Sequence, residues 1–250
     1  MIEAYQADRS WRGKLRRRAV RLVSRRPARA PAGPMVSFAF DDAPLSAAEA
    51  GAAVLETRGL RGSFFICAGL AGQDGPSGRY AGAEAVRRLV EAGHEVGCHT
   101  YSHLDCGQAA ACEAVEDVAR NAEALAVWGA PAPATFAWPY GDVSAGPKRA
   151  LAGRFSLLRG LHKGLIIAGT DLNQAPAVGV EGPLGEAIAR RWLRRAASSR
   201  AWLILFTHDV AEAASPWGCT PHALARLADE AVALGFETVT VAEGARRLAG

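Results

Sequence analysis

The residues best suited to chemistry in this sequence are acids and histidines that follow short apolar segments. Asp41 and Asp42 are adjacent and come directly after the apolar segment 35–40. Two carboxylates held close together repel each other unless a cation or a proton lies between them. The natural division is one metal ligand and one base. The plainer alternative is a helix N-cap beside a solvated acid.

Histidines end two further apolar segments. His99 and His103 lie four residues apart at the end of segment 95–100, so both can converge on one ion as they would on a helical turn. His208 follows the apolar run 202–207 and could act as a general acid or base. A structural histidine at the rim of the sheet is the alternative for His208.

An aromatic turn and another acid complete the candidates. Segment 134–138 runs into a Pro–Tyr–Gly turn at 139–141. Such a turn can direct the backbone N–H of Tyr140 toward an oxyanion, and Trp138 could stack on a sugar or fill the core. Asp171 also follows an apolar segment. It could be another site carboxylate, or it could cap a turn that leads to Asn173.

Alternating segments must position these side chains. We expect strands at 35–40, 62–68, 95–100, 134–138, 155–158, 164–168, 201–207 and 236–241. We expect helices at 47–58, 83–92, 109–128, 184–198, 221–234 and 242–248. Repeated β–α alternation predicts an α/β protein with a parallel sheet, either open or closed as a barrel. In both layouts the chemistry lies at the carboxyl ends of the strands.

Length and composition fit one soluble domain. The chain has 250 residues, of which 50% are apolar and 22% charged, which suits a single α/β domain. No run of 18 apolar residues suggests a transmembrane helix. Five cysteines without regular spacing argue for a reducing compartment. Because the first residues also lack the pattern of a secretory signal, we expect the protein in the cytoplasm.

Residues 1–34 form a basic arm, partly helical, ahead of a domain at 35–250. The arm has ten Arg or Lys and two acids, whereas the remainder has 19 basic and 23 acidic residues. An apolar stripe runs between the arginines: Trp11, Leu15, Ala19, Leu22 and Val23. This pattern predicts peripheral attachment of residues 9–29 to the inner membrane. The alternatives are packing on the domain or in a homodimer. The acidic domain argues against a nucleic-acid partner.

Several motifs together resemble a known enzyme family. They read FDDAP at 40–44, HTYSH at 99–103, PYG at 139–141 and LFTH at 205–208. In this order they are similar to the polysaccharide deacetylases of carbohydrate esterase family four, the NodB-homology domain, and within it to bacterial exopolysaccharide and holdfast deacetylases. The resemblance covers about residues 35–245. It implies a distorted (β/α) barrel of about seven parallel strands.

The resemblance also implies a role for each matched residue. The metal ligands would be Asp42, His99 and His103; the catalytic base would be Asp41, the catalytic acid His208, and the oxyanion donor the N–H of Tyr140.

This sequence departs from the family pattern in two places. The family often has an arginine two residues before the third-motif proline, where this chain has Ala137. Arg159 is a candidate to orient Asp41 in its place. The family also has an aspartate that supports the catalytic histidine, and Asp171 is the candidate for that role.

The implied reaction is metal-dependent hydrolysis of N-acetyl groups on N-acetylhexosamine units of a bacterial exopolysaccharide, with release of acetate. Three protein ligands leave coordination positions open for catalysis. A His₂Asp set suits Zn²⁺ first, with Co²⁺, Mn²⁺ or Ni²⁺ as alternatives. Two other functions stay open: a metal-dependent amidohydrolase acting on a small or lipid-linked sugar, and a catalytically silent, membrane-associated scaffold.

Overall fold

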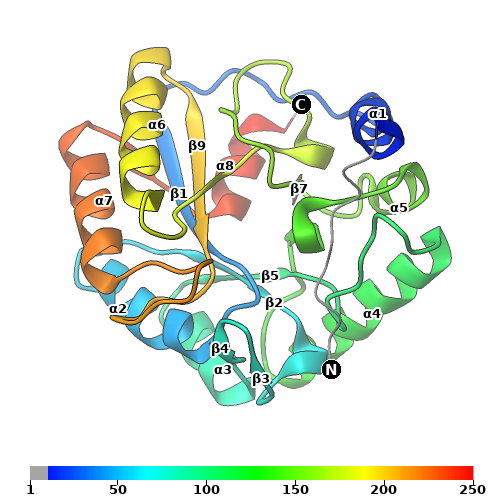
Figure 1. The fold of residues 1–250 in the computed structure, drawn as a ribbon, viewed down its shortest axis with the longest axis horizontal. Helices are drawn as coiled ribbons and strands as arrows, with labels where there is room; N and C mark the ends of the chain where they lie inside the picture. Colours follow the sequence, from blue (N-terminus) through cyan, green and yellow to red (C-terminus); the bar gives the residue numbers. More distant parts are fainter. Residues whose placement is uncertain (1–10, 250) are drawn as a thin grey trace.

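A computed structural model describes residues 11–249 and shows one strongly curled, parallel sheet surrounded by helices (Figure 1). Its strands are β1 (Met35–Phe40), β2 (Ser63–Ile66), β5 (Glu95–Cys98), β6 (Thr135–Ala137), β7 (Leu157–Arg159), β8 (Val178–Gly179) and β9 (Trp202–Thr207). They are hydrogen-bonded in the order β7-β6-β5-β2-β1-β9-β8, and the short β10 (Glu237–Thr238) also pairs with β1. All of these pairings are parallel.

One segment joins the two edges of this sheet. Ala175 forms a parallel bridge with Arg159 of β7, and three residues later β8 pairs with β9 on the opposite edge. The segment from η4 (Leu172–Gln174) to β8 therefore closes the sheet into a distorted barrel. The predicted fold, a distorted (β/α) barrel of about seven parallel strands, is confirmed.

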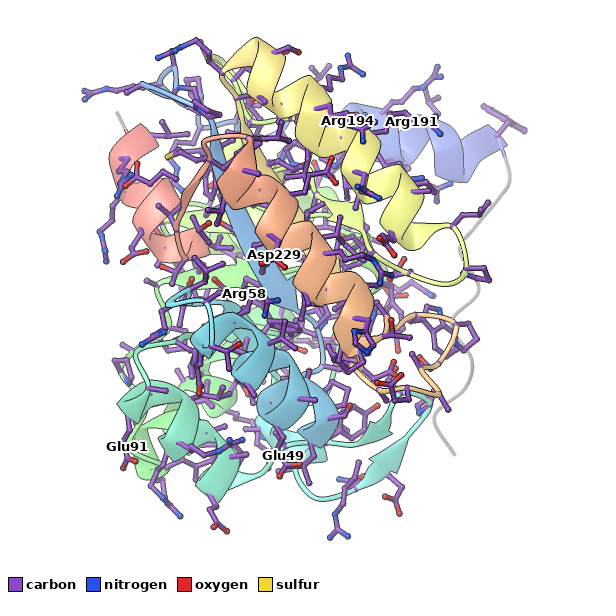
Figure 2. All side chains as sticks on the ribbon, turned by 90° about the vertical axis from the view of Figure 1, so that its left-hand side faces the viewer. Glu49, Arg58, Glu91, Arg191, Arg194 and Asp229 are labelled. Carbon is purple, nitrogen blue, oxygen red and sulfur yellow. The ribbon has the colours of Figure 1, made fainter. Side chains whose placement is uncertain are left out.

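Helices cover the outer face of the barrel: η1 (Ala47–Gly51), α2 (Ala52–Glu56), α3 (Ala83–Glu91), α4 (Ala111–Val127), α5 (Ala145–Leu151), α6 (Gly185–Ser199) and α7 (Pro221–Ala233). The last helix, α8 (Val241–Leu248), instead packs its buried residues into the inner core. Surface ion pairs join neighbours: Arg58, just after α2, makes two hydrogen bonds with Asp229 of α7 (Figure 2). Because this pair is exposed, its contribution to stability is small.

The strands are buried on both faces, and their side chains alternate between two cores. On β1, Phe38 and Phe40 pack beneath the outer helices, whereas Ala39 points into the barrel. On β9, Leu205 faces outward and Phe206 inward. This period of two is a property of every strand. It also means that the second residue after Ala39, Asp41, continues the inward-facing row.

Most predicted elements are present, and the differences have local causes. A strand is expected at 164–168, but only a single antiparallel bridge forms there, between Ile166 and Trp202. No pattern in the sequence indicates β8, which has only two residues, or the hairpin formed by β3 (Asp74–Gly75) and β4 (Gly78–Arg79). Helix α5 is also missing from the predicted elements because Gly146 and Pro147, which usually break helices, lie in its first turn.

The described part of the basic arm packs along the barrel. It begins with α1 (Trp11–Val20) and continues as extended chain. The backbone N–H of Ala28 donates to Thr170 O at 2.8 Å, and that of Arg29 donates to Leu248 O at 2.9 Å. Val20 is buried. Within residues 11–249, no helix is long and apolar enough to cross a membrane.

Candidate active site

One carboxylate and two imidazoles meet at the carboxyl ends of β1 and β5. Asp42 Oδ1 lies 3.1 Å from His103 Nε2 and 3.4 Å from His99 Nε2. The backbone of Asp42 and His103 is left-handed, with φ of 57° and 58°. Such conformations are costly for non-glycine residues and collect at functional sites. Here the two tight turns direct all three side chains to one point.

Two of the atoms that meet there are acceptors. His99 Nδ1 lies 2.8 Å from the carbonyl oxygen of Ala137. A carbonyl only accepts, so Nδ1 carries the proton and Nε2 of the neutral ring presents a lone pair to Asp42. Asp42 Oδ1 is buried and has no hydrogen-bond donor among residues 11–249. Burial opposes the charged carboxylate. When the two imidazoles are protonated, their hydrogen bonds and charge outweigh burial and hold the pKa of Asp42 well below its usual range, and a bound cation would take the place of these protons. This donor set fits a divalent cation.

Asp41 turns away from this cluster and pairs with Arg159 inside the barrel. Arg159 Nη2 donates to Asp41 Oδ1 at 2.5 Å, and both side chains are almost completely buried. The guanidinium lies between the rings of Phe65 and Phe206, at 5.3 and 5.0 Å from their centroids. A buried carboxylate needs such a partner. With Oδ1 occupied, Oδ2 remains for proton transfer.

His208, at the end of β9, has an acidic partner of its own. Its Nδ1 lies 3.4 Å from Glu181 Oε1 and 3.3 Å from the carbonyl oxygen of Trp217. Burial alone would lower the pKa of His208, but the hydrogen bond to Glu181 and the charges of Asp41 and Asp42 raise it to about 9. The ring is therefore an imidazolium at neutral pH. A cation held by Asp42 would remove part of this increase.

In the aromatic segment after β6, Tyr140 contacts the site and Trp138 does not. Tyr140 lies in the turn η3 (Pro139–Gly141) with a left-handed backbone, φ 57°. Its ring packs edge-on against His103, with centroids 4.4 Å apart, and so limits the movement of that ligand. Trp138 is completely buried against Phe136. The expectation that Trp138 could stack on a sugar is wrong, and its alternative role in the core is confirmed.

Asp171 does not contact His208, the residue that we expected it to support. Its carboxylate binds Lys148 Nζ at 2.7 Å and accepts the backbone N–H of Asn173 at 3.0 Å. It thus caps the turn η4, which was the alternative interpretation. His208 is supported by Glu181 instead. Sequence reasoning missed Glu181 because it lies in none of the motifs; its position two residues after β8, beside β9, was the available signal.

Comparisons with known proteins agree with this geometry. The profile of the polysaccharide deacetylase family matches residues 28–152, half of the chain. This chain belongs to the polysaccharide deacetylase family. Membership makes it a hydrolase of this class, as the four motifs predicted. No curated protein sequence matches the chain.

Solved structures with the same fold are distant in sequence. A chitin deacetylase from the fungus Colletotrichum lindemuthianum is 20% identical over 86% of this chain and 89% of its own, with a TM-score of 0.64. An acetyl xylan esterase from Clostridium thermocellum, in complex with a cobalt ion, is 20% identical over 84% of this chain and 89% of its own, with a TM-score of 0.59. A pseudoenzyme is 13% identical over 86% of this chain and 68% of its own, with a TM-score of 0.58. These likenesses show the deacetylase fold.

Arg159 reaches Asp41 from the strand next to the one where the resemblance led us to expect an arginine. The expected position is Ala137 on β6, and the sheet register pairs Ala137 directly with Arg159 of β7. Both residues face the barrel interior, since Ala137 belongs to the inner core. The predicted contact between Arg159 and Asp41 is therefore present.

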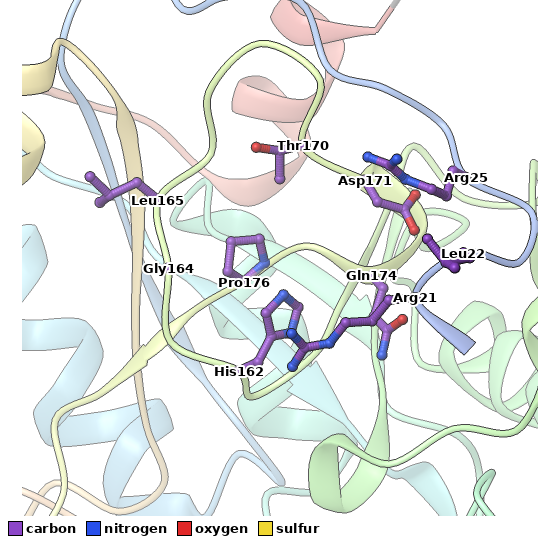
Figure 3. Close-up of a pocket in the computed structure, with 10 residues that line it drawn as sticks. All are labelled: Arg21, Leu22, Arg25, His162, Gly164, Leu165, Thr170, Asp171, Gln174 and Pro176. Atoms are coloured by element: carbon purple, nitrogen blue, oxygen red, sulfur yellow. The ribbon is translucent and has the colours of Figure 1, made fainter. Parts of the chain in front are cut away.

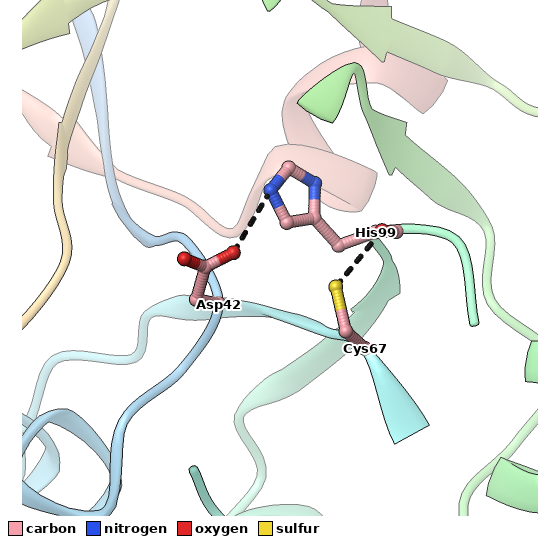
Figure 4. Close-up of side chains that lie close together, drawn as sticks. All are labelled: Asp42, Cys67 and His99. Carbon is pink, nitrogen blue, oxygen red and sulfur yellow. Dashed lines mark hydrogen bonds and ion pairs between the residues drawn. The ribbon is translucent and has the colours of Figure 1, made fainter. Parts of the chain in front are cut away.

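Cys67 is a neighbour of the metal-ligand cluster that sequence reasoning did not single out. It follows β2, and its sulfur lies within 4.8 Å of ligand atoms of Asp42 and His99 (Figure 4). The thiol donates to the carbonyl oxygen of His99 at 3.0 Å. Burial, with the nearby Asp42 charge, raises the pKa of Cys67 well above its usual value. The strand order could have indicated this residue, because β2 lies between β1 and β5, which carry Asp42 and His99 at their ends.

Proposed function

We propose that this deacetylase removes N-acetyl groups from N-acetylhexosamine units of a bacterial exopolysaccharide and releases acetate. The observation that carries this proposal is the arrangement around Asp42. A cluster suited to a cation lies beside Asp41 and close enough to His208 for the charges of Asp41 and Asp42 to act on that ring. Asp41 and His208, the proposed proton-transfer groups, each have a charged partner of their own.

Asp42, His99 and His103 would hold one divalent cation, for which the His₂Asp set suits Zn²⁺, with Co²⁺, Mn²⁺ or Ni²⁺ also able to bind. Such an ion, when bound, polarises the acetamide carbonyl and makes a water molecule more acidic. The fit rests on the unsatisfied Asp42 oxygen and on the proton at His99 Nδ1. Tyr140 supports the second histidine through its ring.

Asp41 is placed to accept the proton of the attacking water. Arg159 fixes one carboxylate oxygen at 2.5 Å, so the other oxygen has a defined direction. General bases of this kind must lie within hydrogen-bond reach of the proton that they remove. The flanking Phe65 and Phe206 rings keep Arg159 in one orientation.

His208 is placed to supply a proton to the departing nitrogen. As water attacks the acetamide carbon, the C–N bond breaks, the nitrogen receives the imidazolium proton, and acetate and a free amine are formed. Nδ1 faces Glu181 and the Trp217 carbonyl oxygen, which leaves Nε2 as the donor toward substrate. Glu181 raises the pKa of His208 and so favours this protonated form.

We place the reaction in the cytoplasm. Five cysteines carry free thiols, and that of Cys112 is exposed, which suits a reducing compartment. A silent scaffold is the weaker proposal, because it has no use for the buried Asp41–Arg159 pair, and buried ions cost stability when they are desolvated.

The test is acetate release from a panel of N-acetylhexosamine polymers, using metal-stripped protein and protein reloaded with each of the four ions. We expect activity only after reloading, and only with an acetylated polymer. Reloaded protein that releases no acetate from any polymer or lipid-linked sugar would overturn the proposal. Release from a monosaccharide alone would favour the small-molecule alternative.

A further inference from the structure

The basic arm has an inner and an outer face. The inner face holds the arm on the domain: Arg16 pairs with Asp142 at 2.5 Å, and Lys148 Nζ donates to Val20 O at 3.0 Å. The outer face carries Trp11, Leu15 and Leu22, which are 70%, 59% and 76% exposed. Their spacing puts the first two on one side of α1, and Leu22 continues that side beyond the helix end. Packing on the domain therefore leaves Leu15 and Leu22 largely exposed within the described chain.

Positive charge surrounds this stripe. The side chains of Arg18, Arg21, Arg25 and Arg29 are exposed. No acidic residue occurs between Asp8 and Asp41 to balance them. An exposed apolar stripe flanked by arginines is the pattern of a helix that lies at the surface of an anionic bilayer.

A pocket opens between the arm and the loop that follows β7. Its volume is about 320 Å³, and Arg21, Leu22 and Arg25 of the arm line it together with His162, Thr170 and Gln174 (Figure 3). Arg21 extends across the pocket toward His162. Asp171 also lines the pocket, but its carboxylate is paired with Lys148.

The chemistry of this pocket suits a phosphate. Two guanidinium groups, the Gln174 amide and the Thr170 hydroxyl offer donors, and guanidinium groups bind phosphate oxygens well. Burial and the charges of Arg21 and Lys148 lower the pKa of His162 to about 4, so its ring is neutral and adds a donor without a charge. Leu22, at the edge of the pocket, belongs to the apolar stripe as well.

We propose that the outer face of the arm docks on an anionic lipid bilayer and that this pocket holds the phosphate of one lipid headgroup. A second copy of the chain is a poorer occupant, because a symmetric contact through this face would bring the same arginines together. A nucleic acid offers phosphates but no apolar phase for Trp11, Leu15 and Leu22. The proposal is independent of the deacetylase reaction.

Sedimentation of the full-length protein with vesicles tests the docking. We expect binding to phosphatidylglycerol-containing vesicles, weaker binding as salt rises, and none to pure phosphatidylcholine. Leu15→Ser/Leu22→Ser should weaken binding by about tenfold or more, because two inserted leucines are lost. Val127→Ser, at an equally exposed site on α4, is the matched control. Equal binding to both vesicle types, or an unchanged double variant, would overturn the docking surface.

Two single variants test the pocket. Arg18→Gln and Arg21→Gln each remove one exposed arm charge, but only Arg21 lines the pocket. General attraction predicts an equal loss of about fivefold for each. We expect a clearly larger loss for Arg21→Gln, and competition by sn-glycerol 3-phosphate in wild-type protein only. Equal losses without competition would exclude the phosphate pocket.

Two further results would point to other occupants. Glycerol phosphate binding that Arg21→Gln removes without any effect on vesicle binding would assign the pocket to a free phosphate ester and overturn the lipid. Conversion of a dimer to a monomer by Leu15→Ser/Leu22→Ser, with vesicle binding unchanged, would make the stripe a subunit interface. Light scattering of the same samples measures this.

Discussion

Replacing Glu181 by glutamine should move the alkaline limit of deacetylase activity to lower pH. His208 must be protonated to donate to the departing nitrogen, and its pKa of about 9 is raised above the ordinary value of 6.5 by Glu181 and by Asp41 and Asp42. Activity is therefore present below this pKa and is lost as the pH rises through it. The substituted amide would keep the shape of the glutamate side chain but remove its negative charge.

The size of this shift in the alkaline pH limit can be worked out from the contact between Glu181 and His208. A hydrogen bond to a charged group contributes about 1.5–3 kcal/mol, and about 1.4 kcal/mol corresponds to one pH unit. The Glu181 side chain is 30% exposed, so solvent screening places the effect at the lower end, about one pH unit. Well above the alkaline limit of the wild-type protein kcat should fall by about tenfold, whereas well below that limit it should change little.

The assay is the pH dependence of kcat for acetate release by metal-loaded protein. Glu212→Gln, an exposed acid on the loop after His208, is the matched control and should leave the profile unchanged. Asp171→Asn should not move the alkaline limit either, although it disturbs Lys148. The reasoning is refuted if Glu181→Gln has the wild-type profile, or if Asp171→Asn moves the limit and Glu181→Gln does not.

Three further predictions concern the remaining site residues. Asp41→Asn should lower kcat by at least about 100-fold while elemental analysis still finds the metal; near-normal kcat would show that Asp41 is not the base. His103→Ala should lose the bound divalent ion in the same analysis, and retention of a full equivalent would remove His103 from the ligand set. Arg159→Ala should lower the free energy of unfolding by about 3–5 kcal/mol, because Asp41 is left charged and unpaired. Adding Ala137→Arg should restore part of it, as urea unfolding would show, since the two positions are paired across β6 and β7.

The sequence was most informative where local chemistry decides the structure. Apolar segments ending in Asp42, His99 or His208 predicted parallel strands that deliver polar side chains to one edge, and β1 begins and ends at the predicted residues. The approach of Arg159 to Asp41 depends on sheet register, which a motif does not contain.

Most features that sequence reasoning missed, such as β8 and the role of Glu181, depend on how distant segments close the barrel. Two-residue β8 has no periodicity to detect, and it forms only because β9 offers a free edge. Glu181 reaches His208 through that closure. The buried position of Trp138 depends on Phe136 and the surrounding core, so the motif alone could not separate a sugar platform from a core residue.

The segment that closes the barrel also sets both proton-transfer groups. Near the start of this segment, Gly160 N–H donates to Ala175 O at 2.8 Å. This bond fixes the backbone beside Arg159 and therefore the position from which Arg159 binds Asp41. At its end, Val180 N–H donates to Phe206 O at 2.7 Å and places the next residue, Glu181, beside His208. The proposed general base, Asp41, and the proposed general acid, His208, thus both depend on this one short segment, which contacts opposite edges of the sheet.

The arm braces the beginning of that stretch. Leu172 N–H donates to Arg26 O at 2.8 Å, and Asn173 Nδ2 donates to Ser24 O at 2.7 Å. Asp171 accepts the N–H of Arg26 at 2.9 Å and binds Lys148. Asp171, which we had expected to support His208, therefore acts on the site only through the closing segment. Because the closing segment rests on the arm, the arm is part of the support of the active site as well as a candidate surface for lipid.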